Sequence, residues 1–455
     1  IAVFKNIAQK EPKNNFTIGI IDDVTFTSLA LEDEVFTGNE DVKECLFFGL
    51  GSDGTVGANK NSIKIIGDKT DLYAQGYFAY DSKKSGGVTR SHLRFSKKPI
   101  RSTYLVKKPN FVACSVPAYL GKYDMISGLR EGGIFLLNTI WDKEKLIKYV
   151  PNEIKRELAR KKAKFYLINA TEIAKEIGLG NRTNTIMQSA FFYLSEVIPH
   201  DEAKEYMKEY AEKSYGRKGQ DIVQKNWDAI DRGIDGLEEV EVLPEWADLE
   251  VNEQIIEAAK PEFIKKIADP INLMKGNELP VSSIIENGMV DGSFQHGTAH
   301  YEKRGIADEV PEWQPDMCIQ CNQCAYVCPH AVIRPFLIDE EEMAKAPEGM
   351  PTIKALGRGM NDLNYKIQVS PLDCTGCSAC VDVCPAPRGK AIVMKPIQSQ
   401  IERNEIEYTD YLFNNVSYKD KILGKNTVKG SQFAKPLFEF SGACAGCGET
   451  PYIKL

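Results

Sequence analysis

The chain has 455 residues with 57 Lys and Arg, 64 Asp and Glu and five His, which gives a formal net charge of −7. This mild acidic excess argues against general nucleic-acid binding, which needs a basic face. A hydrophobic share of 43% is ordinary for a globular protein, and no apolar run approaches the roughly 18–20 residues of a membrane helix. We expect a cytoplasmic multidomain protein that binds neither nucleic acid nor membrane.

The first 240 residues have the pattern of an α/β domain. Short apolar runs typical of strands alternate with helical patterns, which favours a doubly wound parallel sheet. The strand-like runs are 16–21, 44–50, 72–80, 111–114, 134–137 and 165–169. Cys45 and Cys114 lie on two of them and are expected to be buried thiols. An apolar helical face over 184–198 predicts core packing, and alternating Glu and Lys over 201–213 predict a solvated helix.

A glycine-rich turn follows the second strand-like run. Gly49, Gly51 and Gly54 match G-x-G-x-x-G, and a helical pattern begins just after them. A strand, such a turn and a helix together present backbone N–H groups to a phosphate. The motif is short, however, and the glycines are better explained by close packing of strand against helix. A P-loop is excluded, because no Gly-Lys-Ser/Thr follows.

A second candidate site for an anion lies at residues 85–94. This segment is expected to be a loop, because it combines small residues with two arginines, Arg90 and Arg94. The alternative is a solvated turn without a ligand.

Ten of the twelve cysteines lie after residue 317, and eight of them form two identical runs. Each run is C-x2-C-x2-C-x3-C followed by Pro, the spacing of bacterial iron–sulfur proteins. In that arrangement the fourth cysteine of each run binds the cluster of the other run. The runs predict two [4Fe-4S] clusters, held by Cys318, Cys321, Cys324 and Cys384, and by Cys374, Cys377, Cys380 and Cys328.

Two other uses of clustered cysteines are less suited to this pattern. Zinc sites also use C-x2-C pairs, but not two identical runs of four with Pro after each. A disulfide framework requires an oxidising compartment, and no secretory signal is seen. Apolar residues at 331–333 and 391–393 predict short strands that cover the clusters. The segment between Cys328 and Cys374 is expected to be an insertion on the outside of the module. His330 is expected to be a surface loop residue, and the alternative is a hydrogen bond from its ring to a cluster sulfur.

Cys444 and Cys447 form half a ligand set in a glycine-rich setting. The chain begins at Ile1 and stops eight residues after Cys447. We therefore expect it to be an internal piece of a longer polypeptide that holds the two missing ligands.

These stretches together resemble pyruvate:ferredoxin (flavodoxin) oxidoreductase, the thiamine-diphosphate-dependent 2-oxoacid oxidoreductase of anaerobes. The resemblance covers essentially the whole chain. Its most specific stretches are 49–67, 85–94, 318–324, 429–433 and 438–452.

The resemblance implies four parts. These are a coenzyme A-associated α/β domain of the gamma type (1–240), a connecting region (241–310), a ferredoxin-like α+β module with two [4Fe-4S] clusters (311–395), and a linker with the start of a thiamine-diphosphate-binding domain (396–455). In that light the candidate contacts to coenzyme A are Gly49, Gly51, Ser52, Gly54, Thr55, Val56, Arg90 and Arg94. Cys444 and Cys447 become ligands of a third cluster, and Glu449 lies near thiamine diphosphate.

The implied reaction is the oxidative decarboxylation of pyruvate with coenzyme A to acetyl-CoA and CO2. Electrons would pass through the clusters to ferredoxin or flavodoxin. The resemblance also implies Mg²⁺ with the thiamine diphosphate, a homodimer, and catalytic residues outside this segment, so that the segment alone should be inactive. The alternative is a non-catalytic electron-transfer subunit, an α/β scaffold that carries a two-cluster ferredoxin.

Overall fold

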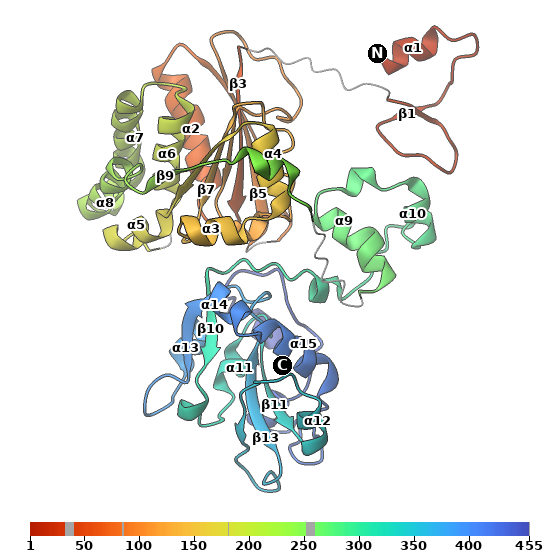
Figure 1. Ribbon diagram of the computed structural model, residues 1–455, viewed down its shortest axis with the longest axis vertical. Coiled ribbons are helices and arrows are strands. Elements are labelled where there is room, and N and C mark those ends of the chain that lie inside the picture. The colour runs from red at the N-terminus through yellow and green to blue at the C-terminus, as the bar shows by residue number, and fades with distance from the viewer. Residues whose placement is uncertain (32–40, 84–85, 181, 252–259, 455) are drawn as a thin grey trace. The chain divides into compact units, whose positions relative to one another are not determined.

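The computed structural model describes residues 1–31, 41–83, 86–180, 182–251 and 260–454 (Figure 1). They form two compact units, which are described separately. The first unit comprises Ile1–Ser82 and Gly87–His296, and the second comprises Lys83–Gly86 and Gly297–Leu455. Over the described ranges, no helix combines the length and the apolar character that crossing a membrane requires.

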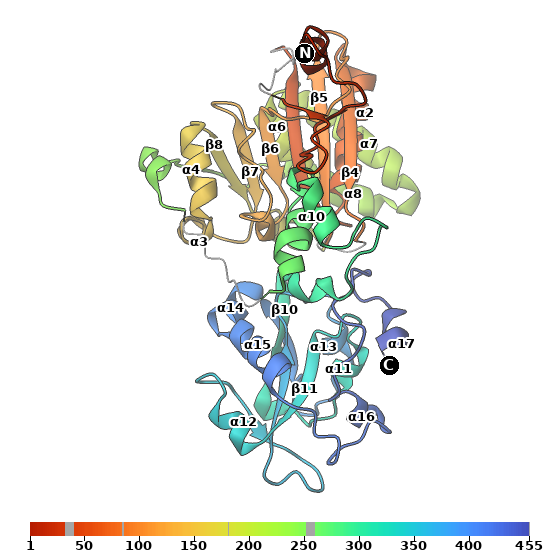
Figure 2. The same cartoon turned by 90° about the vertical axis from the view of Figure 1, so that its right-hand side faces the viewer.

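A seven-stranded sheet in the order β4-β5-β3-β6-β7-β8-β9 forms the centre of the first unit (Figure 2). Neighbouring strands among β3, β6, β7 and β8 are parallel, as the α/β pattern predicts. In contrast, β5 is antiparallel to β3, β4 to β5, and β9 to β8. The strands are β3 (Lys43–Leu50), β4 (Tyr73–Tyr80), β5 (Val88–Ser96), β6 (Phe111–Cys114), β7 (Ile134–Asn138), β8 (Lys164–Ile168) and β9 (Leu237–Val240).

The expectation of a parallel sheet is confirmed for the centre of the sheet and wrong at both margins. At one margin the reason is β5. This strand contains most of the segment that was predicted to be a loop. Leu93 and Phe95 are buried as in any core strand, but Ser91 is fully buried as well. Buried polar residues therefore hide the strand pattern in the sequence. The predicted strand at 16–21 contains only the two-residue β1 (Thr17–Ile18), which pairs with β2 (Ser28–Leu29) outside the main sheet.

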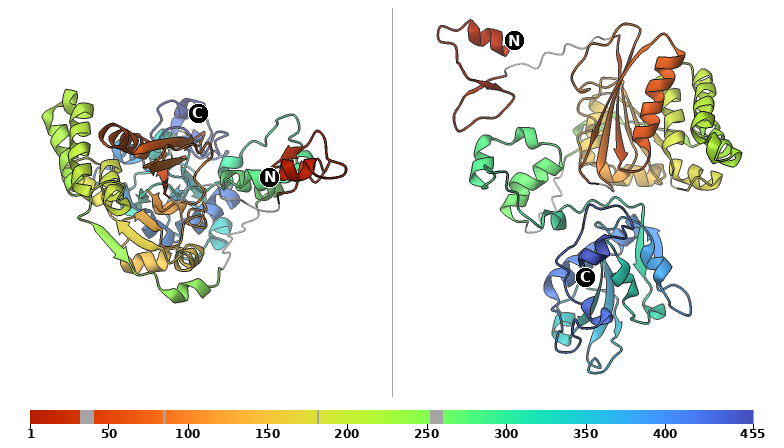
Figure 3. Two further views of the ribbon diagram at one scale, coloured as in Figure 1. Left: turned by 90° about the horizontal axis from the view of Figure 1, so that it is seen from above. Right: turned by 180° about the vertical axis from the view of Figure 1, so that it is seen from behind.

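Helices cover both faces of this sheet (Figures 1 and 3). One face buries Phe47 and Phe111, and the helices that pack there are α2 (Thr55–Lys69), α5 (Ala170–Ile177), α6 (Asn184–Ser195), α7 (His200–Tyr215) and α8 (Gln220–Asp231). The other face buries Phe48 and Phe135 against α3 (Lys143–Tyr149) and α4 (Asn152–Arg160). Strand residues thus alternate between two cores. The apolar face predicted over 184–198 is confirmed, because Ile186, Ala190 and Phe191 are buried in the first core.

The remainder of the first unit is built from short elements. They are α1 (Ala2–Ile7), α9 (Asp269–Asn272) and α10 (Val281–Glu286). The N–H of Val281 donates to the Ile21 carbonyl over 2.9 Å, and the N–H of Ser282 donates to the Asp23 carboxylate over the same distance. These bonds join the N-terminal segment to the start of α10.

The second unit is built around two antiparallel sheets. In one, β10 (Glu309–Trp313) pairs with β14 (Ile392–Pro396), which joins the two ends of the cysteine-rich region. In the other, β11 (Ile333–Ile338), β13 (Asn364–Val369) and β12 (Ile353–Lys354) lie in the order β11-β13-β12. Strands β11 and β14 confirm the prediction that each cysteine run is followed by a strand.

Seven short helices of the second unit complete this module. They are α11 (Gln323–Val327), α12 (Glu340–Ala344), α13 (Ala379–Val383), α14 (Ile397–Glu402), α15 (Glu405–Asn415), α16 (Val428–Ser431) and α17 (Thr450–Lys454). The segment between the cysteine runs does not lie only on the outside, because Tyr365 and Ile367 of β13 share the core with Cys324 and Cys380. Residues after 396 also pack on this module, since Tyr408 and Leu412 of α15 enclose Phe336 of β11.

Candidate metal centres in the cysteine-rich unit

One small cavity of the second unit is lined by four cysteines, Cys318, Cys321, Cys324 and Cys384. Three come from the first run and one from the second, which is the crossed combination that the spacing predicts. Cys318 lies near enough to Cys384 for their charges to interact. Trp313 and Tyr365 complete much of the remaining wall. Four sulfur donors around an enclosed, mainly apolar space fit the donor set of a [4Fe-4S] cluster.

The second combination is assembled around Cys328. The charge of this residue interacts with Cys374 and Cys380, and Cys377 interacts with the same two residues. Burial raises the pKa of Cys380 to about 12 and also raises that of Cys374. Buried thiols in this setting form thiolates only with a compensating cation, which bound iron provides.

The two cysteine loops have matching backbones. Gln320 and Asn322 in the first loop and Gly376 and Ser378 in the second all have positive φ, between 57° and 71°. In both loops the first cysteine accepts a hydrogen bond from the backbone N–H two residues after it. Gln320 donates to Cys318 Sγ and Gly376 donates to Cys374 Sγ, over 3.4 Å in each case. Two left-handed residues in each loop turn the chain around its sulfurs. Within the described ranges, no three His, Cys, Asp or Glu side chains are grouped so as to hold a single metal ion.

The loop that carries Cys444 and Cys447 packs against the second cysteine set. A side chain at Gly446 would begin 3.4 Å from Cys377 Cβ, so the two loops are in contact there. The hydroxyl of Thr450 donates to the Pro329 carbonyl over 2.7 Å and holds the far end of the loop. Glu449 is exposed beside Cys447.

A buried ion pair anchors the near end of the same loop. Arg334, on β11, donates to the Glu439 carboxylate, whose other oxygen lies 3.2 Å from His300 Nδ1. Burial would raise the pKa of Glu439, but the hydrogen bond with His300 and the charge of Arg334 outweigh it and lower the pKa to about 2. The guanidinium also stacks over Phe413 and Phe440. The sequence carries no signal for this network, because its members are far apart along the chain.

His330 is buried, and the expectation that it is a surface loop residue is wrong. It is 2% exposed, and its Nδ1 lies 3.1 Å from the Ser441 carbonyl. Its own carbonyl accepts the Phe440 N–H over 2.9 Å. The residue is covered because the loop around Cys444 folds back over it.

The glycine-rich turn of the first unit follows β3 and leads into α2, as predicted. However, the Asp53 carboxylate already accepts the N–H groups of Leu50 and Thr55 over 2.8 and 2.7 Å. A side chain on Gly49 would begin 2.7 Å from Thr55 and Thr89, and Gly54 has a φ of +89°. The glycines thus serve close packing and a left-handed turn, and an aspartate occupies the place that a phosphate would take at the helix.

Arg94 does not lie in a loop and does not face solvent. It is 3% exposed, and its Nε donates to Glu44 Oε1 over 2.7 Å. Gln75 accepts a second bond at 3.0 Å, while Arg130 approaches the other Glu44 oxygen at 3.2 Å. The charge of Arg94 is therefore neutralised within the sheet, which removes the reason for assigning it to an anionic ligand.

Arg90 lies at a cavity of about 940 Å³ in the first unit. Cavities of roughly 300–1,000 Å³ are typical of small-molecule sites. Four further basic residues line it, and the sequence analysis did not single them out: Lys107, Lys108, Arg130 and Lys161. The signal in the sequence that could have indicated this basic cavity was the pair of adjacent lysines, Lys107 and Lys108.

Cys45 and Cys114, as predicted, are buried, and burial raises the pKa of each to about 12.

Three family models match the chain. Pyruvate ferredoxin/flavodoxin oxidoreductase matches residues 44–236, a domain of unknown function matches 250–307, and the 4Fe-4S dicluster domain matches 317–388. Pyruvate oxidoreductase subunit PORC of Thermotoga maritima aligns with 44% of this chain and with all of its own, at a TM-score of 0.37 and 21% identity.

Two curated relatives align with the chain over its whole length. It is 54% identical to a pyruvate:ferredoxin oxidoreductase of Moorella thermoacetica and 53% identical to a pyruvate-flavodoxin oxidoreductase of Enterobacter agglomerans. The chain spans 38% of the length of each of these relatives. This identity extends across both the oxidoreductase match and the 4Fe-4S dicluster match, so the chain is similar over its whole length to one part of the pyruvate:ferredoxin/flavodoxin oxidoreductases.

Proposed function

We propose that this chain is the part of a pyruvate:ferredoxin (flavodoxin) oxidoreductase that conducts electrons from the decarboxylation of pyruvate to a carrier protein. The observation that carries the proposal is the crossed pairing of two identical cysteine runs in a chain 54% identical to such an enzyme. In the whole protein, coenzyme A receives the acetyl group and ferredoxin or flavodoxin receives the electrons.

The proposed ligands follow from the two cysteine sets. One [4Fe-4S] cluster is held by Cys318, Cys321, Cys324 and Cys384. The second is held by Cys374, Cys377, Cys380 and Cys328. Cys444 and Cys447 supply two ligands of a third, and the rest of its ligands come from outside this sequence.

The contact between Gly446 and Cys377 supports an order for electron transfer. Of the two complete sets, the one that contains Cys377 is next to the Cys444 loop, and we propose that it receives electrons first. The Cys318 set is then the outer cluster, from which the carrier is reduced. Thiamine diphosphate with Mg²⁺, when bound by the whole protein, supplies the carbanion chemistry of decarboxylation. Glu449 is proposed to lie near that cofactor, and the whole protein is proposed to be a homodimer.

For coenzyme A, the first unit offers two regions, and we favour the basic cavity. Arg90 and the lysines around it present positive charge to a cavity of suitable size. The turn with Gly49, Gly51, Ser52, Gly54, Thr55 and Val56 is the weaker candidate, because Asp53 would repel a phosphate there. Arg94 is not proposed as a contact to coenzyme A, because its guanidinium is paired with Glu44.

The experiment is anaerobic viologen reduction by the whole natural polypeptide, with pyruvate, with and without coenzyme A. We expect reduction that requires pyruvate and becomes faster with coenzyme A. Reduction with a different 2-oxoacid alone would change the substrate and keep the electron pathway. If protein with full iron content reduces no viologen with any 2-oxoacid, the proposed oxidoreductase activity is refuted. A non-catalytic electron-transfer subunit is then the better account.

A further inference from the structure

Trp313 forms part of the wall of the cavity that Cys318, Cys321, Cys324 and Cys384 line. It ends β10 and is only 7% exposed. Its indole N–H is buried and has no hydrogen-bond partner among the residues that the structure describes. Native proteins rarely leave a buried donor unpaired, because it loses its bond to water without replacement. The donor is therefore available to an acceptor in this cavity.

The side of the cavity that the indole faces is sulfur-rich. Cys318 lines the same cavity as Trp313, and the indole lies near enough to interact with its sulfur. The other aromatic donor in the wall, Tyr365, is already used, because its hydroxyl donates to Asn322 Oδ1 over 2.6 Å. Trp313 is thus the donor still available to sulfur at the Cys318 position.

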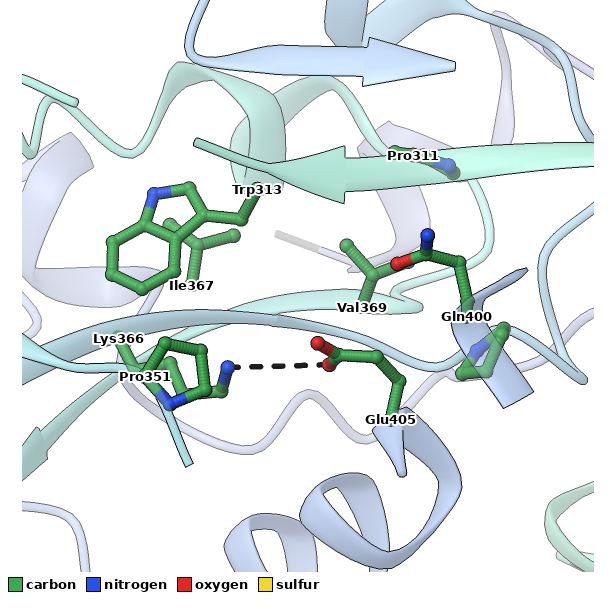
Figure 4. A pocket seen from close by; sticks show the side chains of 9 residues that line it. Pro311, Trp313, Pro351, Lys366, Ile367, Val369, Gln400 and Glu405 are labelled. Carbon is green, nitrogen blue, oxygen red and sulfur yellow. Dashed lines mark ion pairs between the residues drawn. The ribbon is translucent and has the colours of Figure 1, made fainter. Parts of the chain in front are cut away.

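A buried cation lies against the same indole ring. The ammonium of Lys366 is 5.5 Å from the ring centroid of Trp313, and the residue is 1% exposed. It forms an ion pair with the Glu405 carboxylate at 3.9 Å, which is too far for a hydrogen bond (Figure 4). A buried lysine costs desolvation energy that an apolar residue would avoid. The ion pair with Glu405 offsets part of this cost, and the ammonium stays close to the indole ring.

The second cysteine set has no tryptophan at the matching position. Trp313 stands five residues before the first cysteine of its run, and the residue five before Cys374 is Val369. Valine has no side-chain donor. Two runs with the same spacing and the same loop backbone therefore differ in what surrounds their sulfurs.

We propose that Trp313 and Lys366 act as positioning residues that raise the reduction potential of the cluster held by Cys318, Cys321, Cys324 and Cys384 relative to the cluster held by Cys374. The inference rests on the proposed function, because it needs iron–sulfur clusters in both sets. Reduction adds one electron, and so one negative charge, to the Cys318 cavity. An N–H donor to sulfur stabilises that charge, and so does the cation that packs against the same indole ring.

No proton transfer is part of this step: the indole keeps its hydrogen, and Lys366, whose pKa is lowered by burial to about 8, is mainly charged at neutral pH. The electron comes from the neighbouring cluster and leaves to the carrier protein. A higher reduction potential at the outer cluster makes electron transfer to it from the Cys374 cluster thermodynamically favourable. Electrons are thereby directed toward the cluster from which the carrier is reduced. The two residues thus give direction to a pair of clusters whose ligand runs are the same.

The test is a potentiometric titration of the whole natural protein, followed by electron paramagnetic resonance in the absence of pyruvate. Trp313→Phe keeps an aromatic ring and removes only the donor. We expect it to lower the potential of one cluster by about 59 mV, which is a tenfold change in a one-electron equilibrium. Lys366→Met should shift the same signal in the same direction. Lys354→Met is the matched control, because Lys354 is an exposed lysine of the same unit and solvent screens its charge.

Cys318→Ser and Cys374→Ser identify which signal belongs to which set. An unchanged potential in Trp313→Phe with full iron content would overturn the proposal, as would a shift confined to the signal that Cys374→Ser removes. A shift in Trp313→Phe without one in correctly assembled Lys366→Met would overturn the role of the lysine. The titration needs no turnover, so its failure is distinguishable from failure of pyruvate-dependent viologen reduction.

Discussion

Replacing Glu439 by Gln should loosen the loop that carries Cys444 and Cys447. Glu439 stands just before this loop and joins it to β11 through Arg334 and to the short 3-10 helix Thr298–Tyr301 through His300. Glutamine has the same shape but no charge. The substitution therefore leaves the Arg334 guanidinium, 6% exposed, without its counter-ion.

The magnitude follows from the pKa of Glu439. The interaction lowers it from 4.5 to about 2, which corresponds to about 3 kcal/mol at 1.36 kcal/mol per pKa unit. Because the folded-state pKa is the lower one, this stabilisation is complete above pH 4.5 and is lost as the pH falls toward 2. It is fully present at neutral pH. Breaking a buried ion pair by removing one partner typically costs about 3–5 kcal/mol, which agrees.

Hydrogen exchange at neutral pH, resolved by mass spectrometry, measures this local stability. The reporter is the Phe440 amide, which donates to the His330 carbonyl. About 3 kcal/mol corresponds to roughly 100-fold faster exchange through local opening in Glu439→Gln. Glu341→Gln is the control, because it removes a surface ion pair with Lys345 that should contribute less than about 1 kcal/mol. Equal protection of Phe440 in both variants would refute the anchoring role.

Three further predictions test the two units. Cys384→Ser should abolish the cluster signal that Cys318→Ser also abolishes; loss of the other signal would contradict crossed ligation. Arg94→Met should reduce hydrogen-exchange protection of β3 and β5, at a cost of about 3 kcal/mol, because Glu44 keeps only Arg130; a higher KM for coenzyme A with protection unchanged would instead restore Arg94 as a ligand. Gly49→Ala should destabilise the first unit by about 1–3 kcal/mol through overpacking, whereas Gly57→Ala, with nothing within 4 Å, should not.

The cysteine spacing made the grouping of the metal ligands predictable. A run of four cysteines with fixed gaps forms a local loop, so its geometry depends on nearby residues, and the two loops indeed share the same backbone. Parallel strands β3, β6, β7 and β8 were predictable for a similar reason, because each is a short apolar run bounded by turns. Such features depend on residues that are contiguous in the sequence.

Long-range pairing accounts for what the sequence did not reveal. The sequence predicts a loop where the structure has β5. Ser91 and Arg94 can be buried there only because β3 and β4 pair with the strand on either side. The burial of His330 could not be predicted locally, because Ser441, which helps to cover it, lies 111 positions further along the chain.

The residues themselves determined that sulfur ligands occur in two equal sets, because ligand type and spacing are local properties. Only the tertiary structure decided what surrounds each set. Trp313 and Lys366 lie on different strands, β10 and β13, and Glu439 meets Arg334 across more than 100 residues. Charge and hydrogen bonding around a buried site depend on such distant neighbours, and these interactions tune chemistry that the ligands alone leave equal.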